Sequence, residues 1–261
     1  MRKRITFNSD AFVRSVILLG FALLFGYLMI TGQITLYINP RFVSMAELAV
    51  YLLIPLLILQ TVKIFDAHKP AESSGCCHSH SSRWIYLPFI ATLLLAFLVP
   101  TNSLDAQLVA NKGLNSKASS KAGPELSNIA RPLAQELSQS KTIQVNDKNF
   151  AEVMSELQLF PADYIGKEIT LTGFVFRSSG LMPNQLDLVR YVISCCAADA
   201  RPFGVLCELK DADKYEDGKW LQIQGIVQMG KYEDQTVSMV KVVTAKEIKS
   251  PGDPYVFPLA Q

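Results

Sequence analysis

Three long apolar runs dominate the first hundred residues of the chain, and each one predicts a membrane-spanning helix. The first, SVILLGFALLFGYLMITG, contains no charged residue, and about 20 apolar residues suffice to cross a bilayer as a helix. The second contains Pro55, which neighbouring helices can tolerate in a membrane. The third begins with Trp84 and Tyr86, aromatic residues typical of a membrane interface. We therefore expect helices over about residues 11–31, 45–64 and 84–102.

A cleaved signal peptide is the alternative interpretation of the first run. The run is longer than the usual apolar core of a signal peptide, and no clear small-x-small cleavage site follows it. Two further apolar runs come after it. These features favour three transmembrane helices within a membrane region of residues 1–104.

Positive residues near the three runs predict how the chain is oriented. The N-terminal MRKR has three of them, whereas the loop of residues 33–44 has only Arg41. The loop of residues 63–83 contains Lys63, Lys69 and Arg83. Because cytoplasmic loops carry an excess of Lys and Arg, the N-terminus and the second loop should be cytoplasmic. We expect a multi-pass protein of the bacterial cell membrane whose chain lies outside after Pro100.

The last part of the chain has the pattern of a soluble domain. Residues 105–141 are rich in Ser, Ala, Asn and Lys and predict a flexible linker. Residues 142–261 form the expected soluble domain, and near its start FAEVMSELQL (residues 150–159) predicts an amphipathic helix with apolar residues at helical spacing. Those residues are Phe150, Val153, Met154 and Leu157.

Five segments of alternating polarity then predict five short strands. Gly173 and Gly225 lie inside two of them, where glycine permits the sharp bends that closing a small barrel requires. An OB-like five-stranded barrel is the expected fold, and another small barrel or a sandwich is the alternative. The residues expected to share one face of their strand are Ile169, Leu171 and Val175; Val189, Tyr191 and Ile193; Phe203, Val205, Cys207 and Leu209; and Leu221, Ile223 and Val227.

Charge and composition exclude several functions. The net charge is only +2, and the C-terminal domain shows no basic groove with exposed aromatic residues, so we expect no nucleic-acid partner. That domain contains no histidine, no CxxC pair and no Gly-rich phosphate loop. These absences argue against a Ser/His/Asp hydrolase, and we predict that the protein is not an enzyme.

The second loop contains the first candidate site, CCHSH. Cys76, Cys77, His78 and His80 offer two thiols and two imidazoles, ligands that suit zinc or copper(I). The spacing is not that of a zinc finger, but short Cys/His tracts can bind metal without a packed core. Reduced thiols are expected on the cytoplasmic side. The alternative is a flexible Ser-rich turn.

The second candidate site is the stretch ISCCAADARPFGVLCEL. Neighbouring residues on a strand point to opposite faces, so Cys195 and Cys196 converge on one ligand only if the strand ends there. Asp199 would add a carboxylate or accept backbone hydrogen bonds, and Arg201 would pair with it. Three roles remain open: a disulfide with Cys207, a metal or thiol site at the pair with Asp199, or small core residues. Burial or bridging suits Cys207 better than catalysis.

Several of these segments together resemble one protein family. SLDAQL, YIGKEITLTGFVFR, VISCCAADARPFGV, KWLQIQGIVQ and PGDPYVFP, with the three apolar runs, are similar to the YcgQ-type family (DUF1980) over nearly the whole chain. The resemblance implies the smaller partner of a two-gene pair. The larger partner would be a predicted permease of the YcgR/YraQ type (DUF318). The resemblance implies no catalytic residues and no substrate.

Three hypotheses of function follow from the sequence. The leading one is an accessory subunit of a two-component membrane permease, with helices that dock against the transporter within the lipid and an outer OB-like domain. The second is a metal-handling membrane protein that uses the Cys/His groups, with zinc as the candidate ion. The third and weaker one is an outer thiol enzyme, which requires an accessible thiol of low pKa at Cys195 or Cys196.

Overall fold

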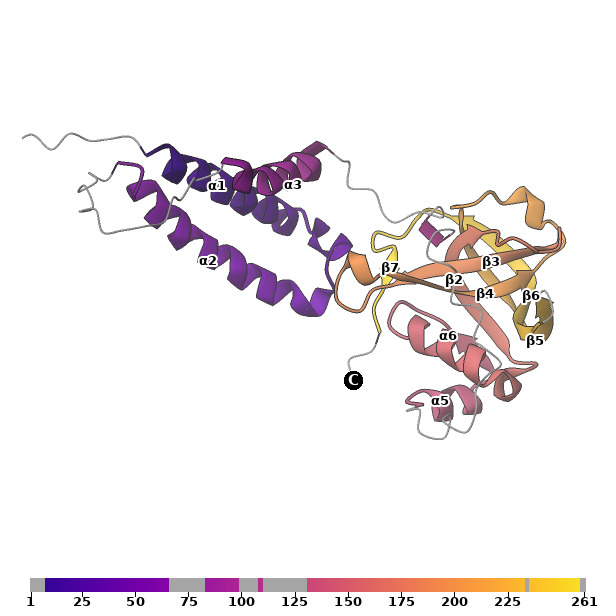
Figure 1. Ribbon diagram of the computed structural model, residues 1–261. Coiled ribbons are helices and arrows are strands. Elements are labelled where there is room, and N and C mark those ends of the chain that lie inside the picture. The colour runs from indigo at the N-terminus through magenta and orange to yellow at the C-terminus, as the bar shows by residue number, and fades with distance from the viewer. Residues whose placement is uncertain (1–7, 66–82, 99–107, 110–130, 233–234, 259–261) are drawn as a thin grey trace, which may run out of the picture. The chain divides into compact units, whose positions relative to one another are not determined.

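The computed structural model describes most of the chain, in two compact units (Figure 1). The first unit, Met1–Thr101, is helical, and the second, Asn102–Gln261, is built around a β-sheet. The described residues are 8–65, 83–98, 108–109, 131–232 and 235–258.

The first unit begins with a pair of long helices. The side-chain oxygen of Asn8 accepts a hydrogen bond from the N–H of Ala11 at 3.1 Å and so caps the first of them. The N–H of Asn8 donates to the carbonyl of Ile64 at 3.2 Å, so the start of this helix lies beside the end of the next one (Figure 1). The helices of this unit are α1 (Ser9–Ile30), α2 (Val43–Val62) and α3 (Leu87–Leu98), with the 3₁₀ helices η1 (Gln33–Leu36), η2 (Pro40–Phe42) and η3 (Arg83–Tyr86).

The third helix packs against the first. A Cβ atom on Gly20 of α1 would lie only 2.8 Å from a methyl carbon of Leu93 in α3, so glycine is what allows this close approach. Six residues earlier on the same helix, the Arg14 guanidinium donates to the Tyr86 hydroxyl at 2.8 Å. The predicted kink residue, Pro55, lies inside α2.

Two of the three predicted spans are long enough to cross a membrane. The helices Ser9–Ile30 and Pro40–Val62 have the required length and hydropathy, and α2 buries none of its side chains. The core helix of a soluble protein buries its apolar side chains, whereas most apolar side chains of these two helices are exposed or half-buried. The apolar helix Trp84–Leu98 is shorter, and residues 99–102 of the predicted third span lie outside the described part of the chain.

The second unit contains the five predicted strands and two very short ones. The short strands β1 and β7 escaped prediction because two or three residues give too few positions for an alternating pattern. The strands are β1 (Thr142–Gln144), β2 (Glu168–Phe176), β3 (Gln185–Val192), β4 (Arg201–Glu208), β5 (Trp220–Tyr232), β6 (Gln235–Ile248) and β7 (Tyr255–Val256). The helices are α5 (Ala134–Gln139) and α6 (Phe150–Leu159), with the 3₁₀ helices η5 (Pro161–Tyr164), η6 (Ala197–Asp199) and η7 (Ala212–Lys214).

The pairings of the five longer strands form a closed cycle. β2 pairs with β5, β5 with β6, β4 with β3, and β3 with β2, all antiparallel, while β6 pairs with β4 in parallel. The register of β5 and β6 shifts at Gln224 and Gly225. A Cβ atom on Gly225 would lie 2.4 Å from the carbonyl oxygen of Lys241, so the backbones approach too closely there for any other residue.

The core lies between α6 and the sheet, as the sequence pattern predicted for most elements. The four apolar residues expected on one face of α6 are all buried, and α6 contacts β4 and β6. The predicted faces of β2, β4 and β5 also contribute to this core. The buried members are Ile169, Leu171, Val175, Val205, Cys207, Leu221, Ile223 and Val227.

The residues predicted to share one face of β3 are buried, but they lie outside the main core cluster. Val189, Tyr191 and Ile193 are at most 1% exposed, whereas Leu186, Leu188 and Val192 are the residues of this strand that belong to the cluster with α6. Tyr191 stacks on Phe174 with ring centroids 5.6 Å apart. All eight residues of β3 are buried, and a strand covered on both faces carries no alternation from which its inner face can be inferred.

Candidate functional site

The first candidate group, in the second loop, lies outside the described residues. Cys76, Cys77, His78 and His80 all fall within residues 66–82. A zinc or copper(I) site at this group therefore stays a prediction.

The second candidate group lies in a turn that follows β3. The strand ends at Val192, and the N–H of Ile193 donates to the carbonyl of Val256 at 3.0 Å. The regular strand therefore stops before the cysteine pair, which is the condition under which neighbouring thiols can converge. The Sγ atoms of Cys195 and Cys196 are 3.7 Å apart. Cys195 is exposed, and Cys196 is half-buried.

Asp199 closes this turn by accepting backbone hydrogen bonds. Its Oδ1 accepts from the N–H of Ser194 at 3.1 Å, and its Oδ2 accepts from the N–H of Cys195 at 2.7 Å. Its own N–H donates to the carbonyl of Cys196 at 3.0 Å. The expected ion pair with Arg201 does not form in the part of the chain that the structure describes, because both carboxylate oxygens are turned toward the backbone of the turn.

The hydrogen bond to Asp199 also changes the pKa of the neighbouring thiol. The hydrogen bond with the Asp199 carboxylate, followed by that with Cys196, raises the pKa of Cys195 to about 11. Partial burial would raise the pKa of Asp199, but hydrogen bonds from the thiol and backbone of Cys195 outweigh it and lower that pKa. A thiol with a raised pKa stays protonated at neutral pH, which argues against the thiol-enzyme hypothesis at Cys195.

Cys207 belongs to the core. It is fully buried on β4, and its thiol donates to the carbonyl of Val205 at 3.6 Å. Burial raises its pKa. Cys195, Cys196 and Cys207 are all free in the structure, so the disulfide alternative is not formed. Cys207 lies in the buried core while the pair lies toward the surface, and this separation favours the core role.

The turn therefore presents two thiols, while its carboxylate already accepts hydrogen bonds from the backbone. Among the described residues, no group of three or more His, Cys, Asp and Glu side chains is arranged to hold a metal ion. Asp199 acts here as the acceptor that fixes the backbone of the turn. Any ligand of this site would bind mainly through Cys195 and Cys196.

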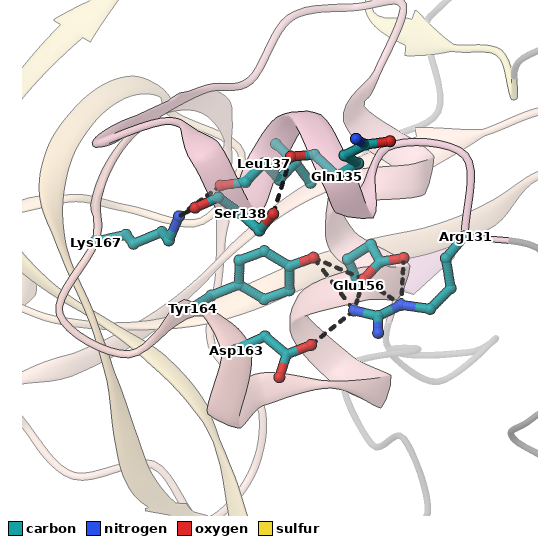
Figure 2. Close-up of polar contacts among 8 residues, drawn as sticks. All are labelled: Arg131, Gln135, Leu137, Ser138, Glu156, Asp163, Tyr164 and Lys167. Carbon is teal, nitrogen blue, oxygen red and sulfur yellow. Dashed lines mark hydrogen bonds and ion pairs between the residues drawn. The ribbon is translucent and has the colours of Figure 1, made fainter.

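Sequence reasoning missed a polar cluster on α6 and η5 (Figure 2). Arg131 binds the carboxylate of Glu156 through two nitrogens, with its shortest contact at 2.7 Å, and binds Asp163 at 2.8 Å. The Tyr164 hydroxyl donates to Glu156 at 2.7 Å. The Arg131 guanidinium also lies 3.6 Å from the centre of the Phe160 ring. This cluster ties the beginning of the described β-unit to its core helix.

Lys167 makes a second set of hydrogen bonds beside that cluster. Its Nζ donates to the carbonyls of Leu137 and Ser138 at 2.6 Å each (Figure 2). It also donates to the carbonyl of Ser140 at 2.8 Å. These carbonyls lie at the C-terminal end of α5, where they have no intrahelical partner and where a positive charge is favourable. Lys167 therefore holds α5 against the loop before β2.

A buried arginine on β3 was also missed. Arg190 is 2% exposed and forms an ion pair with Asp147, and its Nη2 donates to the carbonyl of Asp253 at 3.1 Å. Its guanidinium lies 5.5 Å from the centre of the Trp220 ring. Arg190 thus joins the loop before α6 and the segment before β7 to the sheet.

Only weak signals in the sequence mark these residues. Glu156 directly precedes Leu157 and lies three residues after Val153, so it borders the apolar face of its helix. Arg190 interrupts an otherwise apolar run in LDLVRYVIS. A charge at such a position indicates burial with a partner, but the partners lie far away in the sequence.

Comparison with known proteins also divides the chain into an N-terminal and a C-terminal part. Residues 13–115 match the DUF1980 N-terminal domain, and residues 123–258 match the DUF1980 C-terminal domain. The UPF0703 protein YcgQ of Bacillus subtilis (strain 168) is 28% identical over 285 residues, which cover 94% of this chain and 98% of that protein. A protein of Streptococcus mutans serotype c (strain ATCC 700610 / UA159), provisionally named a two-component membrane permease complex subunit, is 23% identical over 276 residues, with the same coverage. The match to both domain models over most of its length shows that the chain belongs to the DUF1980 family.

Proposed function

We propose that the protein is the accessory subunit of a two-component membrane permease. The observation that carries the proposal is the Streptococcus mutans relative, which aligns with 94% of this chain and is named for such a complex. The two apolar helices that are long enough to cross a membrane support it. Neither relative's name indicates a catalytic function.

In this proposal the chain crosses the membrane three times. The third crossing would extend α3 to about residue 102. The excess of Lys and Arg at the N-terminus and in the loop after α2 supports a cytoplasmic location for both. The β-unit would then lie outside the cytoplasm, joined to α3 by a linker that ends before Arg131, because Arg131 and α5 of the predicted linker (residues 105–141) are bound to the β-unit.

The proposed fold of the outer unit is an OB-like barrel. The closed cycle of pairings through β2, β3, β4, β6 and β5 supports it, because a barrel has no free edge among its main strands. The parallel pair β4–β6 in an otherwise antiparallel cycle, and the register shift at Gly225, also fit a five-stranded Greek-key barrel. In the permease this unit would capture or deliver substrate at the pore mouth.

The helices would dock against the larger permease subunit, which we propose to be of the YcgR/YraQ type (DUF318). Three helices are few for a transport path of their own. The α2 helix supports docking, because it contacts α1 along one side and none of its side chains is fully buried, so its other sides are free for lipid or for a second protein. Leu52 and Ile54 are 57% and 47% exposed. They point in directions about 200° apart on the helix.

Affinity purification from native membranes tests the proposal. With a tag on the C-terminus, we expect the full chain to recover one large multi-pass protein encoded next to it. Recovery of no multi-pass partner after chemical crosslinking in intact membranes would refute the accessory role.

A matched pair of variants sharpens this test. Leu52→Trp and Ile54→Trp add the same bulk to opposite faces of α2. If one face contacts the permease, one variant should lower the recovery of the partner several-fold and the other should leave it unchanged. Equal behaviour of the two would argue against docking through α2.

A further inference from the structure

The turn after β3 has properties that the permease proposal does not use. Its two thiols belong to neighbouring residues, yet they lie side by side at the surface, with their Sγ atoms 3.7 Å apart. Cys195 is exposed and Cys196 is half-buried, and neither forms a disulfide. A packing role explains Cys207, but it does not explain an exposed pair.

We propose that Cys195 and Cys196 form a two-thiolate binding site for a zinc ion. On binding, both S–H bonds break, two Zn–S bonds form, and two protons pass to solvent. Zinc keeps its charge of +2, so the step requires no oxidant or reductant. The inference is independent of the proposed permease role, since it concerns only what this turn binds.

The sulfur–sulfur distance supports tetrahedral coordination. Two thiolates that bind one zinc ion at about 2.3 Å with a tetrahedral angle are about 3.8 Å apart. The observed 3.7 Å agrees with this spacing. A linear arrangement with bonds of similar length would need about 4.6 Å, so the geometry favours a tetrahedral ion over a two-coordinate one.

The turn is also held in place before any ion binds. The Asp199 carboxylate accepts from the N–H groups of Ser194 and Cys195 at 3.1 and 2.7 Å. The N–H of Ile193 is bonded to Val256 of β7 at 3.0 Å. Asp199 is therefore a positioning residue, and a pre-formed pair loses less conformational freedom on binding than two mobile cysteines.

Such a site would exchange its ion rather than lock it in the fold. Structural zinc sites use four protein ligands, whereas this turn supplies two, because Asp199 is engaged by the backbone of the turn and the described residues contain no group of three His, Cys, Asp or Glu side chains arranged to hold a metal. Water or groups of another molecule would fill the two remaining positions. The expected ligand is therefore a divalent cation that binds thiolates and exchanges readily with the solution.

Zinc titration of the full-length protein tests the inference. The background variant has Cys76 and Cys77 changed to serine and His78 and His80 to alanine, so that the loop group does not contribute. With a phosphine reductant present and a chromophoric chelator as competitor, we expect one zinc equivalent to bind. Changing either Cys195 or Cys196 to serine should weaken binding at least about a hundredfold. The matched control, Cys207→Ala, should retain the ion.

Cobalt provides an independent readout of the ligands. Replacing zinc by Co²⁺ should give a thiolate-to-cobalt charge-transfer band that disappears in Cys195→Ser/Cys196→Ser. If the background variant has both thiols reduced, as a thiol titration would show, and still binds no zinc, the inference is wrong. Equal zinc affinity in the background variant and in the double serine variant would overturn it as well.

Discussion

The salt-bridge cluster of Figure 2 leads to a prediction about the stability of the β-unit. Arg131→Ala removes the guanidinium that binds Glu156, whose side chain is only 7% exposed. The carboxylate then keeps Tyr164 as its hydrogen-bond donor and loses its countercharge. The same change removes the contact of the guanidinium with the Phe160 ring.

The expected loss of stability follows from this geometry. Removing one partner of a fully buried ion pair costs about 3–5 kcal/mol. The Arg131 side chain is 28% exposed, so water can partly hydrate Glu156 in the variant, and the loss falls to about 2–3 kcal/mol. The matched control is Asp163→Asn. Because Asp163 is 51% exposed, removing its charge should cost no more than about 1 kcal/mol.

Urea unfolding monitored by tryptophan fluorescence measures this difference. The chain has two tryptophans, and Trp84→Phe leaves Trp220 of β5 as a probe of the β-unit alone. The shift of the urea midpoint, multiplied by the slope of the transition, gives the change in the free energy of unfolding. Arg131→Ala combined with Glu156→Gln should recover about 1 kcal/mol, because the unpaired charge is then absent.

Two results would refute the reasoning. Equal midpoints for Arg131→Ala and Asp163→Asn would mean that the buried carboxylate does not depend on Arg131. Strict additivity of Arg131→Ala and Glu156→Gln would mean that the two side chains do not interact.

Three further predictions concern other parts of the β-unit. Lys167→Met should speed amide hydrogen exchange in α5 and leave exchange in β3 unchanged, because the carbonyls at the end of α5 lose their donor; unchanged α5 exchange would contradict this. Gly225→Ala should lower the free energy of unfolding by about 1–3 kcal/mol, because the added Cβ atom would meet a backbone oxygen. Gly252→Ala is the control in the same urea assay, because a Cβ atom at Gly252 would meet no atom within 4 Å. Maleimide alkylation of Cys195 should rise with pH up to about 11, because its thiol stays protonated below that pKa. Asp199→Asn should lower the pKa of the Cys195 thiol and speed its alkylation at pH 8 by up to about tenfold. An identical rate in the unchanged protein and in the Asp199→Asn variant would show that Asp199 does not control the pKa of this thiol.

The sequence predicted the main elements well where a repeating pattern and a single buried face coincide. The five strands and α6 carry such a pattern, and their apolar positions form the core. β3 is the exception, because both of its faces are covered: the predicted Val189 and Tyr191 are buried, but Leu186 and Leu188 are the residues that join the main core cluster. β1 and β7 are too short to show a period.

The candidate site was predicted only in part. Local pattern identified Cys195, Cys196 and Asp199, and the strand does end before the pair. The role of Asp199 as a backbone acceptor depends on the conformation of the turn, which the residue types alone do not specify. The polar ties at Arg131, Lys167 and Arg190 join segments 25 to 63 residues apart, and no local pattern reveals such partners.

The sequence by itself thus determined the apolar helices, the strand segments, the α6 face and the cysteine pair, because each depends on the chemistry and spacing of nearby residues. Tertiary structure alone decided the order of strand pairing, the inner face of β3, the partners of the buried charges and the 3.7 Å separation of two neighbouring thiols. These features depend on contacts between distant segments, whose free energies are realised only when the whole β-unit packs around its core.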